Sequence, residues 1–138
     1  MLGEIVLESA GKITNIKVLE NAGERSKVEV SVQGQGKLLG TGMAEMASYW
    51  QEIRPGHILY GEGGPVWMTD EGDVLSWKGF GVGRPTGPGF SASFAVCGAI
   101  QTSSERYASL AGNALIGEYN IDEAGNYTWT LWEWKPQG

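Results

Sequence analysis

Hydrophobic and polar residues alternate most regularly between Lys27 and Leu38, in the stretch KVEVSVQGQGKL. Three valines share one face with Gly34, Gly36 and Leu38, whereas the intervening positions are charged, hydroxyl or amide residues. Strict alternation with β-branched residues is typical of a strand that has one dry and one wet face. The chain is therefore expected to contain β-sheet.

Further segments predict strands of the same kind, bounded by glycine-rich or polar turns. They are residues 4–8, 12–20, 43–53, 57–69, 74–83, 90–101, 106–121 and 127–134. Residues 43–53 also fit a helical stripe, but Gly40 and Gly42 before them and Pro55 after them favour a strand with a bent end. Gly72 and Gly125 occupy tight turns where a positive φ is needed.

These elements predict an all-β protein with residues 1–138 forming one domain. Closely spaced turn signals indicate a sandwich or a closed barrel. Long strands joined by tight hairpins favour a single antiparallel up-and-down barrel of about eight strands. Closure would also remove exposed sheet edges.

The glycine-rich stretch GEGGPVWMTDEGDVLSWKGFGVG, residues 61–83, superficially resembles a phosphate-binding loop. Its last glycines have the spacing G-x-G-x-G, whereas a dinucleotide fingerprint needs G-x-G-x-x-G between a strand and a helix. Pro85 and Pro88 rule out an ordinary helix after it, and no Gly-Lys-Ser/Thr is present. A nucleotide site is not expected.

A three-residue DEG loop would instead place Gly63 opposite Gly79 and Gly61 opposite Gly81. Trp67 and Trp77 share that face with the four glycines. The resulting smooth floor allows sharp coiling of the barrel, close packing of another group, or a ligand cavity. The sequence leaves these three alternatives open.

Three residues are weak candidates for catalysis. His57 is the single histidine and a possible general base, although a histidine after Arg-Pro-Gly is more often at a loop end. Glu62 and Arg84 flank the glycines and would orient a ligand if they faced the lumen, whereas exposure or a rim salt bridge is the simpler interpretation. Glu118 and Glu133 are a further carboxylate pair to consider.

Aromatic residues suggest both a core and a contact surface. The candidates for ligand binding are Trp67, Trp77, Gly79, Gly81, Glu62, Arg84 and Trp129. Trp132 and Trp134 lie on the opposite face of the last strand. The strand around Cys97 carries no charge on either face, which predicts a covered outer face and hence a homo-oligomer, with a dimer favoured.

Composition narrows the function classes. The net charge of −6 and the estimated pI of 4.7 disfavour nucleic acid and anionic lipid surfaces. One cysteine and one histidine exclude an intramolecular disulfide and a multi-histidine or multi-cysteine metal site. No signal peptide, membrane span or cofactor motif is evident, so a cytoplasmic protein without a cofactor is expected.

The stretches GEGGPVWMTDEGDVLSWKGFGVGRPTGPG and GEYNIDEAGNYTWTLWEWK resemble a family of small uncharacterised bacterial proteins grouped with allene-oxide-cyclase-like barrels. These barrels are broadly streptavidin- or lipocalin-like in shape. The resemblance implies an eight-stranded antiparallel barrel and the theme of an apolar ligand in the barrel mouth. No cyclase residue matches a position of this chain, so the resemblance implies no catalytic residue.

Three functions follow as hypotheses. The favoured one is binding of a small apolar or amphipathic ligand in the barrel. An isomerase-, cyclase- or hydrolase-type enzyme acting on such a ligand is the first alternative. A structural homo-oligomer without a small-molecule role is the second, built on residues 90–100 or on Trp132 and Trp134.

Overall fold

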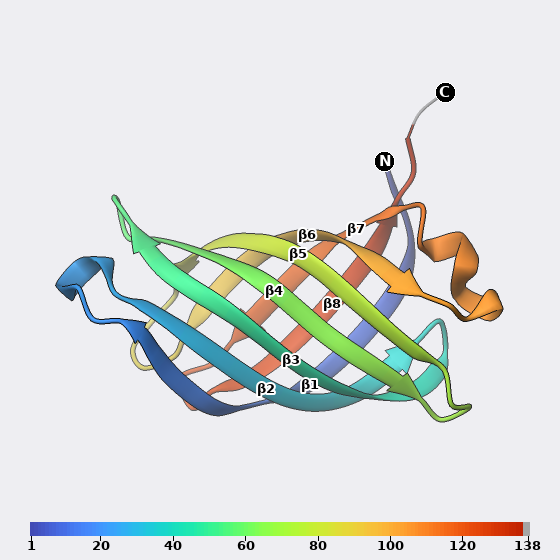
Figure 1. The fold of residues 1–138 in the computed structure, drawn as a ribbon. Coiled ribbons are helices and arrows are strands. Elements are labelled where there is room, and N and C mark those ends of the chain that lie inside the picture. The colour runs from blue at the N-terminus through green and yellow to red at the C-terminus, as the bar shows by residue number, and fades with distance from the viewer. Residues whose placement is uncertain (137–138) are drawn as a thin grey trace.

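A computed structural model describes residues 1–136 and shows eight antiparallel strands that close into an up-and-down barrel (Figure 1). Each strand pairs with its neighbours in the chain, and β1 closes the ring against β8. The strands are β1 Leu2–Glu20, β2 Lys27–Leu38, β3 Thr41–Arg54, β4 Ile58–Thr69, β5 Val74–Pro85, β6 Ala92–Thr102, β7 Ala114–Ile121 and β8 Asn126–Trp134. The predicted fold class is confirmed.

Several local predictions are also confirmed. Val30, Val32 and Leu38 are buried, as the alternation of residues 27–38 requires. Residues 43–53 lie within β3, so the strand interpretation was correct. Gly72 and Gly125 have φ values of 90° and 92°, which L residues with side chains rarely adopt.

Two predicted boundaries are wrong. Residues 4–8 and 12–20 form one continuous strand, because Gly11 lets β1 pass close against the backbone of β2 instead of turning. Residues 105–110 form the short 3-10 helix η2, Glu105–Leu110, and β7 begins only at Ala114. In η2 the buried Tyr107 and Leu110 are three residues apart, which is the 3-10 period.

The barrel is closed at one end by its own side chains. The helix η2 lies across this end (Figure 1) and buries Tyr107 and Leu110 in the main core. Arg106 holds η2 in place through a salt bridge to Glu71 and a 2.8 Å hydrogen bond to the Thr41 hydroxyl. Ser104 donates to Asp73 at 2.8 Å.

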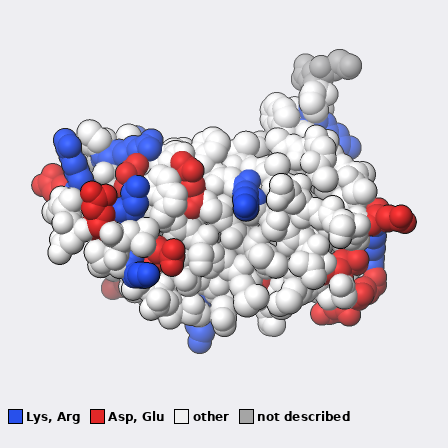
Figure 2. Space-filling view, viewed as in Figure 1, with Lys and Arg blue, Asp and Glu red and all other residues white. Residues whose placement is uncertain are grey.

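Charged side chains gather toward the two ends of the barrel on the face shown in Figure 2. The middle of this face, over β3, β4 and β5, is largely uncharged apart from an isolated basic side chain. Within the described chain, no helix has the length and apolar character needed to cross a membrane.

Candidate functional site

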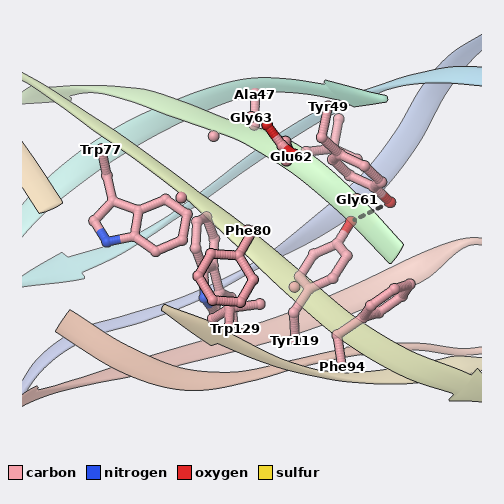
Figure 3. Close-up of a pocket in the computed structure, with 15 residues that line it drawn as sticks. Ala47, Tyr49, Gly61, Glu62, Gly63, Trp77, Phe80, Phe94, Tyr119 and Trp129 are labelled. Atoms are coloured by element: carbon pink, nitrogen blue, oxygen red, sulfur yellow. Dashed lines mark hydrogen bonds between the residues drawn. The ribbon is translucent and has the colours of Figure 1, made fainter. Parts of the chain in front are cut away.

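The barrel contains a cavity of about 60 Å³ between its middle and the β3–β4 turn (Figure 3). Aromatic rings and glycines form most of its wall, and the exposed lining is apolar. The rings belong to Tyr49, Trp77, Phe80, Phe94, Tyr119 and Trp129, and the glycines include Gly61, Gly63, Gly79 and Gly81.

The predicted glycine floor is confirmed. Gly61 pairs with Gly81 and Gly63 pairs with Gly79, as the three-residue loop required. A Cβ atom at Gly61, Gly63 or Gly79 would come within 3.0 Å of a carbonyl oxygen of a neighbouring strand. These three glycines therefore permit close backbone approach, and they border the cavity as well.

Gly81 is the exception among the four. The nearest atom to a Cβ built there is Cγ1 of the Val96 side chain, at 3.0 Å, and its nearest backbone atom is at 3.4 Å. A side chain at position 81 therefore meets a neighbouring side chain before it meets backbone. Gly81 is therefore the floor glycine whose main effect is to keep the cavity open.

The aromatic rings pack tightly around the cavity. Trp77 contacts Trp129 edge to face with centroids 5.2 Å apart, and Tyr119 contacts Trp129 in the same way at 5.8 Å. The hydroxyls of Tyr49 and Tyr119 are 3.2 Å apart and share a hydrogen bond. Burial raises the pKa of Tyr49 to about 12 and also raises the pKa of Tyr119, so both phenols keep their protons at neutral pH.

A buried carboxylate lies beside this cluster and was missed by the sequence analysis. Glu45 is 1% exposed and accepts hydrogen bonds from the Trp67 indole at 2.8 Å and from the Tyr127 hydroxyl at 2.5 Å. The missing side chain of Gly34 makes room for that hydroxyl. The sequence does contain a sign of it, because Glu45 lies between Met43 and Ala47 on the dry face of the same strand.

Two donors in the cavity wall remain unpartnered. The indole nitrogens of Trp77 and Trp129 are buried and have no hydrogen-bond acceptor among residues 1–136. A buried donor without a partner costs about 1–3 kcal/mol. Both indole rings line the cavity, but their N–H groups are buried behind its apolar surface.

The predicted ligand-binding residues lie in three environments, which are the cavity wall, the buried core and the exposed surface. Trp77, Gly79, Gly81 and Trp129 line the cavity, and Glu62 borders it although its side chain is exposed on the outer face. Trp67 is fully buried on the same barrel face but does not line the cavity, because its indole is held by Glu45.

The predicted charged residues point away from the lumen. His57 is exposed in the β3–β4 turn and does not line this cavity. Arg84 is exposed at the same end, where it reaches the Gly56 carbonyl at 3.5 Å. Glu62 is exposed on the outer face and accepts from the Tyr60 hydroxyl at 2.7 Å. The three groups therefore do not converge inside the barrel.

The other carboxylate candidates do not converge either. Strand alternation places Glu118 on the outer face and Glu133 on the inner one, where it accepts from Asn113. Among residues 1–136, no group of three or more His, Cys, Asp and Glu side chains is arranged to hold a metal ion.

A groove of about 680 Å³ lies outside the barrel over β3, β4 and β5. Three aromatic side chains cluster along it. Tyr60 lies 5.6 Å from Trp50 and 6.2 Å from Phe80, measured between ring centroids. Lys27 and Arg54 cover the Trp50 and Tyr60 rings at 4.4 Å and 3.7 Å.

No protein-family model matches this chain, and no curated protein matches it. Solved structures do match along nearly its whole length. A conserved protein of unknown function, RPA1785 from Rhodopseudomonas palustris, is 16% identical, with a TM-score of 0.79 over 96% of this chain and 97% of that chain. A protein of unknown function from Clostridium acetobutylicum ATCC 824 is 10% identical, with a TM-score of 0.81 over 96% and 98%.

A third structure is the beta-barrel like protein ABAYE2633 from Acinetobacter baumannii AYE. It is 12% identical, with a TM-score of 0.77 over 98% of this chain and 96% of that chain. At these identities the likeness shows the fold alone. The chain is thus a small β-barrel protein similar in fold to bacterial proteins of unknown function.

Proposed function

We propose that this protein binds a small apolar or amphipathic molecule in the barrel cavity. The main support is a glycine-floored cavity whose wall is built from Trp77, Trp129 and four further aromatic rings. Ligand sites are typically concave and apolar, with few polar groups that fix orientation. The resemblance to allene-oxide-cyclase-like barrels also suggests an apolar ligand in the barrel.

Substitution of Gly81 tests this proposal with less backbone conflict than substitution of the other three floor glycines. Gly81→Val fills the cavity beside the Val96 side chain. Gly112→Ala is the matched control, because a Cβ there has no atom within 4 Å. We expect native mass spectrometry and solvent extraction to find a co-purified small molecule with the wild type and the control, and to find it lost from Gly81→Val. Full retention by Gly81→Val would contradict the proposal.

An enzyme remains the second candidate, on residues other than those expected. The hydrogen-bonded Tyr49 and Tyr119 hydroxyls stand at the cavity wall with raised pKa values. Protonated phenols of this kind stabilise negative charge that develops on a substrate oxygen. Conversion of an extracted ligand by the wild type but not by Tyr119→Phe is the result that would favour an isomerase-, cyclase- or hydrolase-type enzyme over a binding protein.

A further inference from the structure

The cavity is too small for a whole ligand. It measures about 60 Å³, whereas an apolar cavity known to bind benzene has roughly 150 Å³ and typical ligand pockets reach about 300–1,000 Å³. The groove outside the barrel is far larger, at about 680 Å³. A ligand of ordinary size that uses the cavity must therefore extend beyond it.

The cavity and the groove share part of one wall. Six residues border both spaces, and all of them lie on β4 or β5: Glu62, Gly63, Gly64, Trp77, Gly79 and Phe80. By contrast, the cavity reaches neither end of the barrel. Tyr107 and Leu110 of η2 do not line it at one end, nor do Leu59 and Ile121 at the other.

The seam between β4 and β5 is interrupted where the two spaces meet. Pairing stops after Gly63 and Gly79 and resumes, in the same register, at Val66 and Ser76. Pro65 has no backbone N–H to donate to a ladder. Gly63 and Gly64 have φ values of 143° and 157°, which favour glycine. The sequence Gly-Gly-Pro thus weakens one seam in an otherwise closed wall.

The outer groove offers flat surfaces next to this seam. Phe80 is 46% exposed and continues the ring cluster of Tyr60 and Trp50. Polar groups of Glu62, Ser76 and Lys78 also border the groove. Aromatic rings beside polar groups suit the flat, polar body of an amphipathic molecule.

We propose that this wall forms a composite site for an elongated amphipathic ligand. The narrow apolar end of the ligand occupies the cavity, its flat body lies outside on Phe80 and Tyr60, and it enters between β4 and β5. This inference rests on the proposed function and adds the shape of the ligand and the entrance, which is the barrel wall and not the barrel mouth.

A series of n-alkyl 4-hydroxybenzoates, from methyl to heptyl, probes both halves of the site. Each added methylene that enters the cavity is expected to raise affinity about fourfold, until the cavity is full and the increase stops. Gly81→Val is expected to flatten this dependence on chain length. A wild type that binds the series without any such dependence would overturn the placement of the apolar end.

Phe80→Ala tests the outer half. We expect it to weaken binding of every member of the series by about fivefold while the dependence on chain length stays the same. Phe90→Ala is the matched control, because Phe80 and Phe90 are both 46% exposed and Phe90 lies in the β5–β6 turn. Equal effects of the two substitutions would overturn a role for the groove.

A disulfide across the seam tests the entrance. Val66 and Ser76 lie opposite each other beside the interruption, so Val66→Cys with Ser76→Cys places a disulfide across it. The control disulfide joins β2 to β3 through Gln33→Cys and Met46→Cys, which are also paired positions. Both pairs are made in a Cys97→Ala background, and closure is verified by mass. Oxidation of the 66–76 pair is expected to slow association and dissociation at least about tenfold with little change in their ratio. Unchanged rates would overturn entry through the wall.

Nuclear magnetic resonance supplies a readout that does not depend on disulfide closure. Butyl 4-hydroxybenzoate is expected to shift the indole signals of Trp77 and Trp129 together with the backbone signals of Lys78 and Phe80. Shifts confined to a barrel end would contradict the composite site. If Gly81→Val loses a co-purified ligand but the wild type binds no 4-hydroxybenzoate, the proposed function stands and this inference falls. If Gly81→Val keeps that ligand, both fall.

Discussion

At the residue scale, the least expected group is the carboxylate of Glu45, which is buried without a cationic partner among residues 1–136. Two neutral donors, from Trp67 and Tyr127, satisfy its oxygens. Gly34 contributes by having no side chain where the Tyr127 hydroxyl lies. A glycine in β2, a tyrosine in β8 and a glutamate in β3 therefore act together across the barrel.

Removal of the Tyr127 hydroxyl measures the contribution of this contact. We expect Tyr127→Phe to lower the free energy of unfolding by about 1.5–3 kcal/mol in denaturant titrations, because it takes a donor from a buried carboxylate. Tyr60→Phe is the control, since its hydroxyl bonds Glu62 on the exposed surface and its loss should cost much less stability. Equal losses would contradict the role given to burial.

The buried tyrosines also predict how stability depends on pH. Burial raises the pKa of Tyr49 from 10.0 to about 12. The unfolded chain therefore loses this proton first, so stability is complete below about pH 10 and falls as the pH rises toward 12. We expect Tyr49 alone to contribute a loss of about 1.4 kcal/mol per pH unit in that window. Alkaline denaturation of Tyr49→Phe should be correspondingly less steep.

At the element scale, the sequence predicted the strands with clear alternation and the hairpins with a glycine turn. Residues 27–38 and the pairing of Gly61 with Gly81 are examples. It failed at residues 9–11, where a small, polar stretch resembles a turn but continues β1. It also failed at η2, whose position depends on contacts of Arg106 with distant turns. Such tertiary contacts leave no local pattern in the chain.

The interrupted β4–β5 seam has a measurable consequence of its own. Amides of Gly64 and Lys78 are expected to exchange with solvent at least about tenfold faster than those of Gln33 and Met46, which lie in a continuous ladder. Hydrogen exchange followed by magnetic resonance resolves these positions. Equal protection of the two seams would show that the interruption does not weaken the wall.

At the scale of the whole molecule, closure of the sheet was predictable from the hairpins, whereas the content of the lumen was not. The sequence placed Trp77, Gly79, Gly81 and Trp129 near a cavity, and they line it. It did not show that Glu62 and Arg84 face outward, because the facing of a strand depends on its packing. Nor did it reveal how little space the aromatic rings leave.

The outer surface of the barrel offers a contact through which we propose that a homo-oligomer forms. Paired positions on β6, β7, β8 and β1 form one apolar belt, which consists of Cys97, Ile116, Trp132 and Ile5. Trp134 nearby is 42% exposed. If a homo-oligomer forms, we expect it to bury this belt, so Trp132→Ser should lower the mass measured by light scattering. A wild type that is monomeric at high concentration would contradict this expectation.

Both ligand proposals require that the glycine floor leave an accessible apolar cavity in the barrel. A crystal structure determined under xenon pressure tests it most directly, because xenon enters small apolar cavities that water leaves empty. We expect xenon between Trp77, Trp129 and Gly81 in the wild type and none there in Gly81→Val. A wild-type lumen filled by its own side chains, without xenon at this place, would contradict the account.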